Sequence, residues 1–176
     1  MILNKGRADA ECVRFLKENS LIGELAKKIP ELFREPLFAA ELKRGILTQA
    51  ELSNIICCDI RILPPDLLDE FCENATPNEA GIAILQYPHL WGKFEGKEKI
   101  IGGFGADIWA VLLRGDLMPK CIEPLKKAKR MVLMEIIIKN AKLLPFLKDK
   151  VGFEPTWKEM GRMLILNPEL YRYPEF

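Results

Sequence analysis

Two stretches of this 176-residue chain share one pattern, and that pattern decides the fold class that we predict. They are TPNEAGIAILQYPHL (residues 76–90) and TWKEMGRMLILNPEL (residues 156–170). Threonine, glutamate, glycine, an apolar pair, proline and leucine recur at the same offsets, 80 residues apart. Internal repetition of this kind is typical of arrays of small structural units, so the sequence predicts a repeat protein.

Weaker copies of the pattern lie between and before these two stretches, each with a leucine at the position of Leu90 and Leu170. These anchor leucines are Leu32, Leu67, Leu90, Leu117, Leu143 and Leu170. Four of the five intervals between them are 23 to 27 residues, and the first is 35. An additional helix predicted over residues 35–44 explains the long first interval. We expect Leu90, Leu117, Leu143 and Leu170 to be buried at equivalent positions.

Each copy predicts a pair of short helices. Thr48, Thr76 and Thr156 are each followed three residues later by glutamate, the pattern of a capping box at a helix start. Pro88 and Pro168 end or bend the first helix, because proline supplies no backbone N–H, and a shorter second helix follows. A helix pair this small cannot bury its own apolar face, but stacked pairs can.

The sequence therefore predicts an all-α fold, an irregular right-handed α-solenoid of about six short units, of which the first one or two are degenerate. We expect a single domain over residues 1–176, with capping helices in 1–47 and repeats in 48–173. No convincing strand is predicted. The predicted helices are 8–18, 21–28, 35–44, 48–58, 65–72, 77–86, 89–94, 105–113, 124–139, 141–148 and 157–166.

The pattern resembles a class of short bacterial α-helical tandem repeats, in which an apolar pair precedes Pro-x-Leu and then Phe or Cys, with Trp opening the helix. The best-matching residues are Trp109, Leu112, Leu113, Leu117 and Cys121, and then Trp157, Leu164, Pro168, Leu170 and Tyr173. The resemblance covers roughly residues 48–173, and leucine-rich variant repeats are a similar pattern. It implies a binding scaffold without catalytic residues.

Composition narrows the function classes. The chain has 26 Lys and Arg against 25 Asp and Glu, which argues against a generic nucleic-acid binder. No run approaches the ~18 apolar residues of a membrane span, so we expect no membrane partner. Charged residues follow Met1–Leu3 at once, so no signal-peptide core forms, and we expect a cytoplasmic protein.

No pattern of catalytic or metal-ligating residues is recognisable. His89 is the only histidine, which excludes a His pair, and the five cysteines include no CxxC and are expected to be reduced, buried thiols. Gly102–Gly105 lacks the spacing of a dinucleotide or phosphate loop and is interpreted as a turn. We expect no enzyme, metal or cofactor; an unfamiliar carboxylate or cysteine site remains the enzyme alternative.

Charge is distributed unevenly, and this indicates a candidate site. Residues 91–150 carry a net charge of +6, whereas residues 1–90 carry −4. The densest basic cluster lies between Lys120 and Arg130, on and before one predicted helix. The candidate partner-binding residues are Lys126, Lys127, Lys129, Arg130, Trp91 and Lys93. The alternative interpretation is an ordinary solvated helix face.

These features predict a non-catalytic protein–protein interaction module that binds an acidic partner surface. The sequence does not distinguish an inhibitor from an adaptor or an immunity-type protein, because each of them would bind its partner through such a surface. The alternative is a nucleic-acid-associated protein that binds phosphates through the Lys120–Arg130 patch. Self-association through exposed aromatic side chains is also open.

Overall fold

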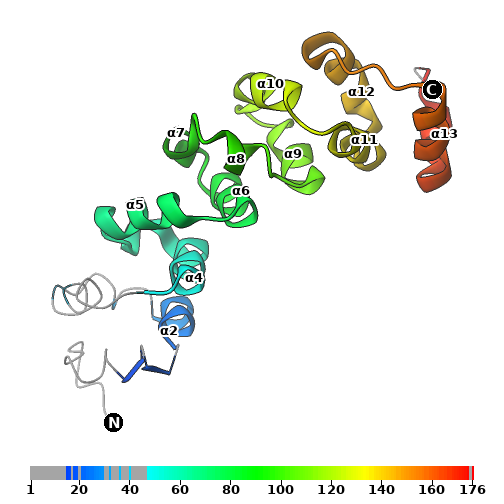
Figure 1. Cartoon of the computed structure of the whole chain (residues 1–176). Helices are drawn as coiled ribbons and strands as arrows, with labels where there is room; N and C mark the ends of the chain where they lie inside the picture. Colours follow the sequence, from blue (N-terminus) through cyan, green and yellow to red (C-terminus); the bar gives the residue numbers. More distant parts are fainter. Residues whose placement is uncertain are drawn as a thin grey trace. The chain divides into compact units, whose positions relative to one another are not determined.

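The computed structural model describes residues 47–174 and 176, together with 15, 16, 18, 19, 21–29, 32, 36 and 40. These residues form helices, turns and connections, and no strand occurs among them (Figure 1). The all-α prediction is therefore confirmed for the described part of the chain. The helices expected at 8–18 and 35–44 lie mostly outside the described residues.

The chain divides into two compact units, Met1–Lys93 and Phe94–Phe176. The single domain that we expected stays a prediction, and each unit is described by itself. The helices of the first unit are α2 (Ile22–Lys28), α4 (Gln49–Asp59), α5 (Pro65–Asn74), α6 (Pro77–Gln86) and α7 (Trp91–Phe94), which ends at the boundary. The second unit holds α8 (Glu98–Ile101), α9 (Ala106–Leu112), α10 (Met118–Lys126), α11 (Arg130–Lys139), α12 (Leu144–Phe146) and α13 (Trp157–Leu166).

Short 3₁₀ or π segments connect several of these helices. They are Ile60–Ile62, Pro88–Leu90, Ala141–Leu143, Leu147–Val151 and Pro168–Arg172. The segments at Pro88 and Pro168 begin directly after α6 and α13, where we predicted that proline ends the first helix.

Helix starts recur at regular spacing. The capping boxes at Thr48, Thr76 and Thr156 are all formed: the threonine Oγ1 accepts from the glutamate N–H at 3.3 Å, and the glutamate carboxylate accepts from the threonine N–H at 2.8 to 2.9 Å. Gly105 and Lys129 precede α9 and α11 with the same extended backbone. These five N-caps are 24 to 29 residues apart. We call the helices that follow them, α4, α6, α9, α11 and α13, the leading helices.

The anchor leucines close a recurring turn after the leading helix. The N–H groups of Leu90, Leu143 and Leu170 each donate to the carbonyl three residues earlier, at 2.9, 3.0 and 3.2 Å. Leu32 makes the same bond to Ile29 at 3.2 Å. All four side chains are buried. The prediction of buried, equivalent anchors is thus confirmed for Leu90, Leu143 and Leu170.

Leu117 departs from this pattern. It is half-buried and serves as the N-cap of α10. The reason is that α9 ends at Leu112 without a proline stop, and Pro119 then opens α10. Cys121 and Leu125, both on α10, are the buried residues in this part of the second unit.

Some predicted helices differ from the structure. The single helix expected over residues 141–148 is instead a 3₁₀ turn (Ala141–Leu143), α12 and a π segment (Leu147–Val151). We expected a single helix over residues 124–139, but α10 ends at Lys126 and α11 begins at Arg130. Proline favours the first turn of a helix, so Pro124 was interpreted as a start; it lies instead inside α10. Lys129 has extended backbone and separates the two helices.

Leading helices that follow one another in the same unit pack together. In the first unit α4 packs on α6; in the second, α9 packs on α11 and α11 on α13. Helix α2, which is not a leading helix, also packs on α4. Phe71 and Trp109 are among the largest fully buried side chains of the two units.

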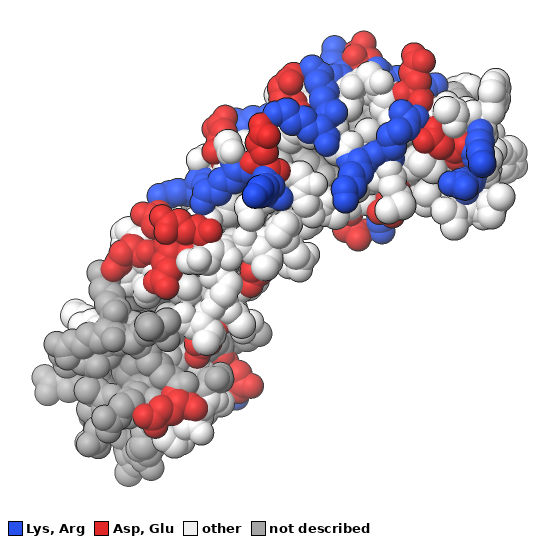
Figure 2. Space-filling view, in the orientation of Figure 1, with Lys and Arg blue, Asp and Glu red and all other residues white. Residues whose placement is uncertain are grey.

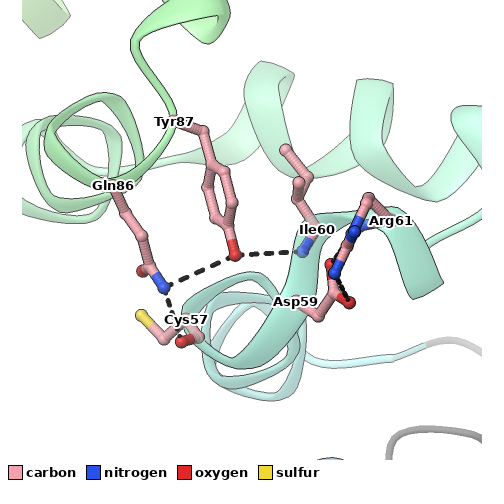
Figure 3. A network of polar contacts seen from close by, with 6 residues as sticks. All are labelled: Cys57, Asp59, Ile60, Arg61, Gln86 and Tyr87. Atoms are coloured by element: carbon pink, nitrogen blue, oxygen red, sulfur yellow. Dashed lines mark hydrogen bonds and ion pairs between the residues drawn. The ribbon is translucent and has the colours of Figure 1, made fainter.

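Side-chain amides tie the ends of these paired helices. Figure 3 shows the first unit, where Gln86 Nε2 donates to the Cys57 carbonyl at 2.8 Å and Tyr87 Oη accepts from the Ile60 N–H at 3.2 Å. In the second unit Asn167 Nδ2 donates to the Ile138 carbonyl at 2.8 Å. Both amide contacts join residues 29 apart. The same kind of contact thus fastens α6 to α4 and α13 to α11.

Candidate partner-binding surface

The four basic candidate residues of the second unit lie at the connection between α10 and α11. Lys126 ends α10, Lys127 is its C-cap, Lys129 is the N-cap of α11, and Arg130 is its first residue. All four are exposed. Lys and Arg side chains gather over this unit, with Asp and Glu among them (Figure 2). The cluster is therefore a basic connection between two helices and not one face of a single helix, as we had expected.

Two of these lysines form ion pairs at the surface. Lys126 Nζ lies 2.6 Å from Glu123 Oε1, and Lys127 Nζ donates to Glu98 Oε1. The hydrogen bond to Glu98 raises the pKa of Lys127. Exposed ion pairs contribute little to stability, so an acidic partner can replace them at small cost. Lys129 forms no ion pair within the part of the chain that the structure describes.

Arg130 has a structural role. Its Nε and Nη2 donate to the two carboxylate oxygens of Glu159 at 2.9 and 2.8 Å, and Nη2 also donates to the Glu154 carbonyl at 2.9 Å. The guanidinium carbon lies 4.8 Å from the centroid of the Phe153 ring. Arg130 thus holds the start of α11 against the start of α13.

The same contact shifts the titration of Glu159. The Arg130 hydrogen bond, followed by the Thr156 N–H, lowers the pKa of this carboxyl to about 2. Glu159 is also the glutamate of the Thr156 capping box. One carboxylate therefore serves both a helix start and a contact between helices, and its shifted pKa has a structural cause.

Trp91 and Lys93 belong to the first unit, whereas the four residues above belong to the second. The Trp91 side chain is only 2% exposed, so it lies in the core and cannot contact a partner directly. We therefore remove Trp91 from the candidate residues. Lys93 is exposed and its Nζ donates to Asp69 Oδ1 at 2.6 Å. The Asp69 hydrogen bond raises the pKa of Lys93.

Sequence reasoning missed an apolar surface on α13. Trp157 is 86% exposed and Ile165 is 81% exposed, and Leu166 is exposed as well. In the repeat pattern Trp157 is the residue that opens the helix, and its exposure was not predicted. The available signal was that apolar residues lie on more than one face of this helix, which exceeds what a single core contact can bury.

The four cysteines in the described part of the chain differ in exposure. Cys72 and Cys121 are buried as expected, but Cys57 is exposed and Cys58 is half-buried near the end of α4. Burial raises the pKa of Cys121 to about 12, which keeps the thiol protonated and unreactive at neutral pH. Among the described residues, no three His, Cys, Asp or Glu side chains are placed to hold a metal ion. No helix in the described ranges is long and apolar enough to cross a bilayer.

Comparison of the chain with protein-family models, curated proteins and solved structures finds no match. The resemblance to short bacterial helical repeats therefore stays a prediction.

Proposed function

We propose that this chain is a non-catalytic protein–protein interaction module built as an irregular α-solenoid of short helical repeats. The recurring helix starts, the recurring leucine turns and the packing of successive leading helices within each unit support the repeat architecture. Stacked repeats present rows of neighbouring helices, and such surfaces are widely used to bind other proteins.

The observation that carries this proposal is the exposed basic connection between α10 and α11. Lys129 has no carboxylate partner among the described residues, and the ion pairs of Lys126 and Lys127 are with exposed carboxylates that a partner can displace. The second unit as a whole carries a net charge of +4. An acidic protein surface complements this charge and is steered toward it.

The experiment is affinity capture from a lysate of the source cells, with and without nuclease and at two salt concentrations. We expect the wild-type chain to retain a protein after nuclease and the Lys127→Glu/Lys129→Glu variant to lose it. A matched control, Lys142→Glu/Lys148→Glu, makes the same charge change elsewhere in the second unit and should retain the partner.

Equal recovery with both variants would contradict the assignment of this surface. Recovery that disappears with nuclease and falls steeply with salt would favour the alternative, a nucleic-acid-associated protein, because counterions are released when phosphates are bound.

A further inference from the structure

The outer side of α13 is an apolar face on which two large side chains are almost fully exposed, Trp157 and Ile165. Trp157, Gly161 and Ile165 follow one another at four-residue spacing, with Leu164 beside them, so they share one side of the helix. Met163, the fully buried residue of α13, lies on the opposite side. We call Trp157, Gly161, Leu164 and Ile165 the α13 face.

The equivalent face of α6 is buried at two of its four positions and half-buried at the other two, Pro77 and Leu85. Gly81 and Ile84 stand at the positions of Gly161 and Leu164 in the repeated pattern, and both are buried. On α13 the two corresponding residues are half-exposed, although the helix begins with the same capping box. A face that is built for packing in one copy of the pattern is therefore open in the other.

Gly161 supplies a second observation. It lies in the middle of α13, where glycine is less favourable than alanine. A Cβ atom added at this position would meet no atom within 4 Å, so packing among the described residues does not require glycine here. Glycine at this point allows the backbone of another molecule to approach closely.

The charged residues beside the α13 face indicate the chemistry of the partner. Lys158 and Arg162 flank one edge and are exposed, and neither has an ion pair in the part of the chain described. The nearest carboxylate on the helix, that of Glu159, is held by Arg130. The face is thus apolar with an unneutralised basic edge.

We propose that the α13 face binds an amphipathic α-helix of a partner protein, whose apolar stripe is flanked by carboxylates. The inference rests on the proposed function, and it adds a second surface and the chemistry of the segment that is bound. A second copy of α13 fits less well, because the only carboxylate on this helix, that of Glu159, is already held by Arg130 and so does not offset Lys158 and Arg162. Apolar anchors seated in a groove are the usual mode for binding a helix.

Fluorescence quenching of Trp157 tests this proposal in the full chain. Trp91 and Trp109 are buried, so acrylamide quenches mainly Trp157. The probes are two synthetic helical peptides with the same leucine stripe, one flanked by glutamate and the other by lysine. We expect the glutamate peptide to protect Trp157 and to bind about tenfold more tightly than the lysine peptide. Equal affinities, or no protection by the glutamate peptide, would overturn the proposal.

A pair of glycine variants locates the binding. Gly161→Leu fills the open space on α13 and should weaken the glutamate peptide about tenfold or more. Gly92→Leu, which also has no atom within 4 Å of the new Cβ, is the matched control in the first unit and should leave binding unchanged. Unchanged binding by the Gly161→Leu variant would overturn the proposal. So would a dimer in sedimentation that this substitution abolishes, because the occupant would then be a second copy.

These results separate the two proposals. Loss of the captured partner in Lys127→Glu/Lys129→Glu, with no peptide effect on Trp157, would leave the proposed function intact and reject the α13 face. The opposite result is that the glutamate peptide protects Trp157 while Lys127→Glu/Lys129→Glu captures as much partner as the wild type. That result would support the α13 face and reject the basic connection.

Discussion

Helices α6 and α13 begin in the same way and end in the same way, yet they bury different surfaces. Both start at a capping box, and both are followed by a proline and a buried anchor leucine. In α6 the side that carries Gly81 and Ile84 is buried, whereas the corresponding side of α13 carries the highly exposed Trp157 and Ile165. Local sequence therefore determines the helix and its turn, and the neighbours of the helix determine which residues are core.

The largest effect is expected when the buried anchor leucine that follows each of the two helices is removed. Leu90→Ala and Leu170→Ala should each lower the free energy of unfolding by about 2–5 kcal/mol, because each removes a buried side chain and leaves a cavity. Urea unfolding followed by circular dichroism measures both. A cost within experimental error for either variant would show that its leucine is not an anchor of the fold.

The next prediction tests whether the stability of the protein depends on the apolar face of α6 but not on that of α13. Ile84→Ala should cost about 2–5 kcal/mol of stability, because Ile84 is fully buried. Ile165→Ala should stay within about 0.5 kcal/mol of the wild type, since that side chain is already in solvent. Comparable losses from both substitutions would mean that the α13 face is covered in the isolated protein.

The helix starts and the turns that α6 and α13 share could be predicted from the sequence, because they depend on residues close together in the chain. The Thr-x-x-Glu pattern predicts a helix start from hydrogen bonds within four residues, and all three capping boxes are formed. The turns at Leu90, Leu143 and Leu170 are local as well, because each is closed by a hydrogen bond to the carbonyl three residues earlier.

The exposure of the tryptophans could not be predicted in the same way. Trp91 was expected at a binding surface and is buried, while Trp157, matched only to the start of a repeat helix, is exposed. Burial depends on residues far away in the chain, so the pattern of apolar residues around each tryptophan does not decide which face of its helix is covered. The break between α10 and α11 was missed for a related reason: no Gly or Pro marks residues 127–129.

A smaller effect is expected at the two mid-helix glycines. Gly161→Ala should raise the free energy of unfolding by about 0.5–1 kcal/mol, because the new methyl group meets no atom and alanine favours the helix. Gly81→Ala should be destabilising, since Gly81 is buried and an additional methyl group crowds a packed position. Thermal unfolding of the two variants side by side checks the opposite signs, and a stabilising Gly81→Ala would contradict the comparison.

The contact between Arg130 and Glu159 gives α13 a dependence on pH. The pKa of Glu159 is lowered in the folded protein from 4.5 to about 2, so the folded state binds this proton less readily than the unfolded chain. Its stabilising contribution is therefore complete above pH 4.5 and is lost as the pH falls toward about 2. Denaturant unfolding of wild type and Glu159→Gln should differ at neutral pH and converge in acid. A difference that stays constant over this range would contradict the assigned ion pair.

The central claim is that the chain binds a protein through its second unit. The most direct test compares the proteins that three baits retain from one lysate after nuclease treatment. The wild-type chain, Lys127→Glu/Lys129→Glu and the control Lys142→Glu/Lys148→Glu are used as baits in the same lysate. We expect one protein to be retained by the wild type and the control and to be lost with Lys127→Glu/Lys129→Glu. Retention of the same protein by all three baits, or recovery that nuclease removes, would contradict a protein-binding role for this basic surface.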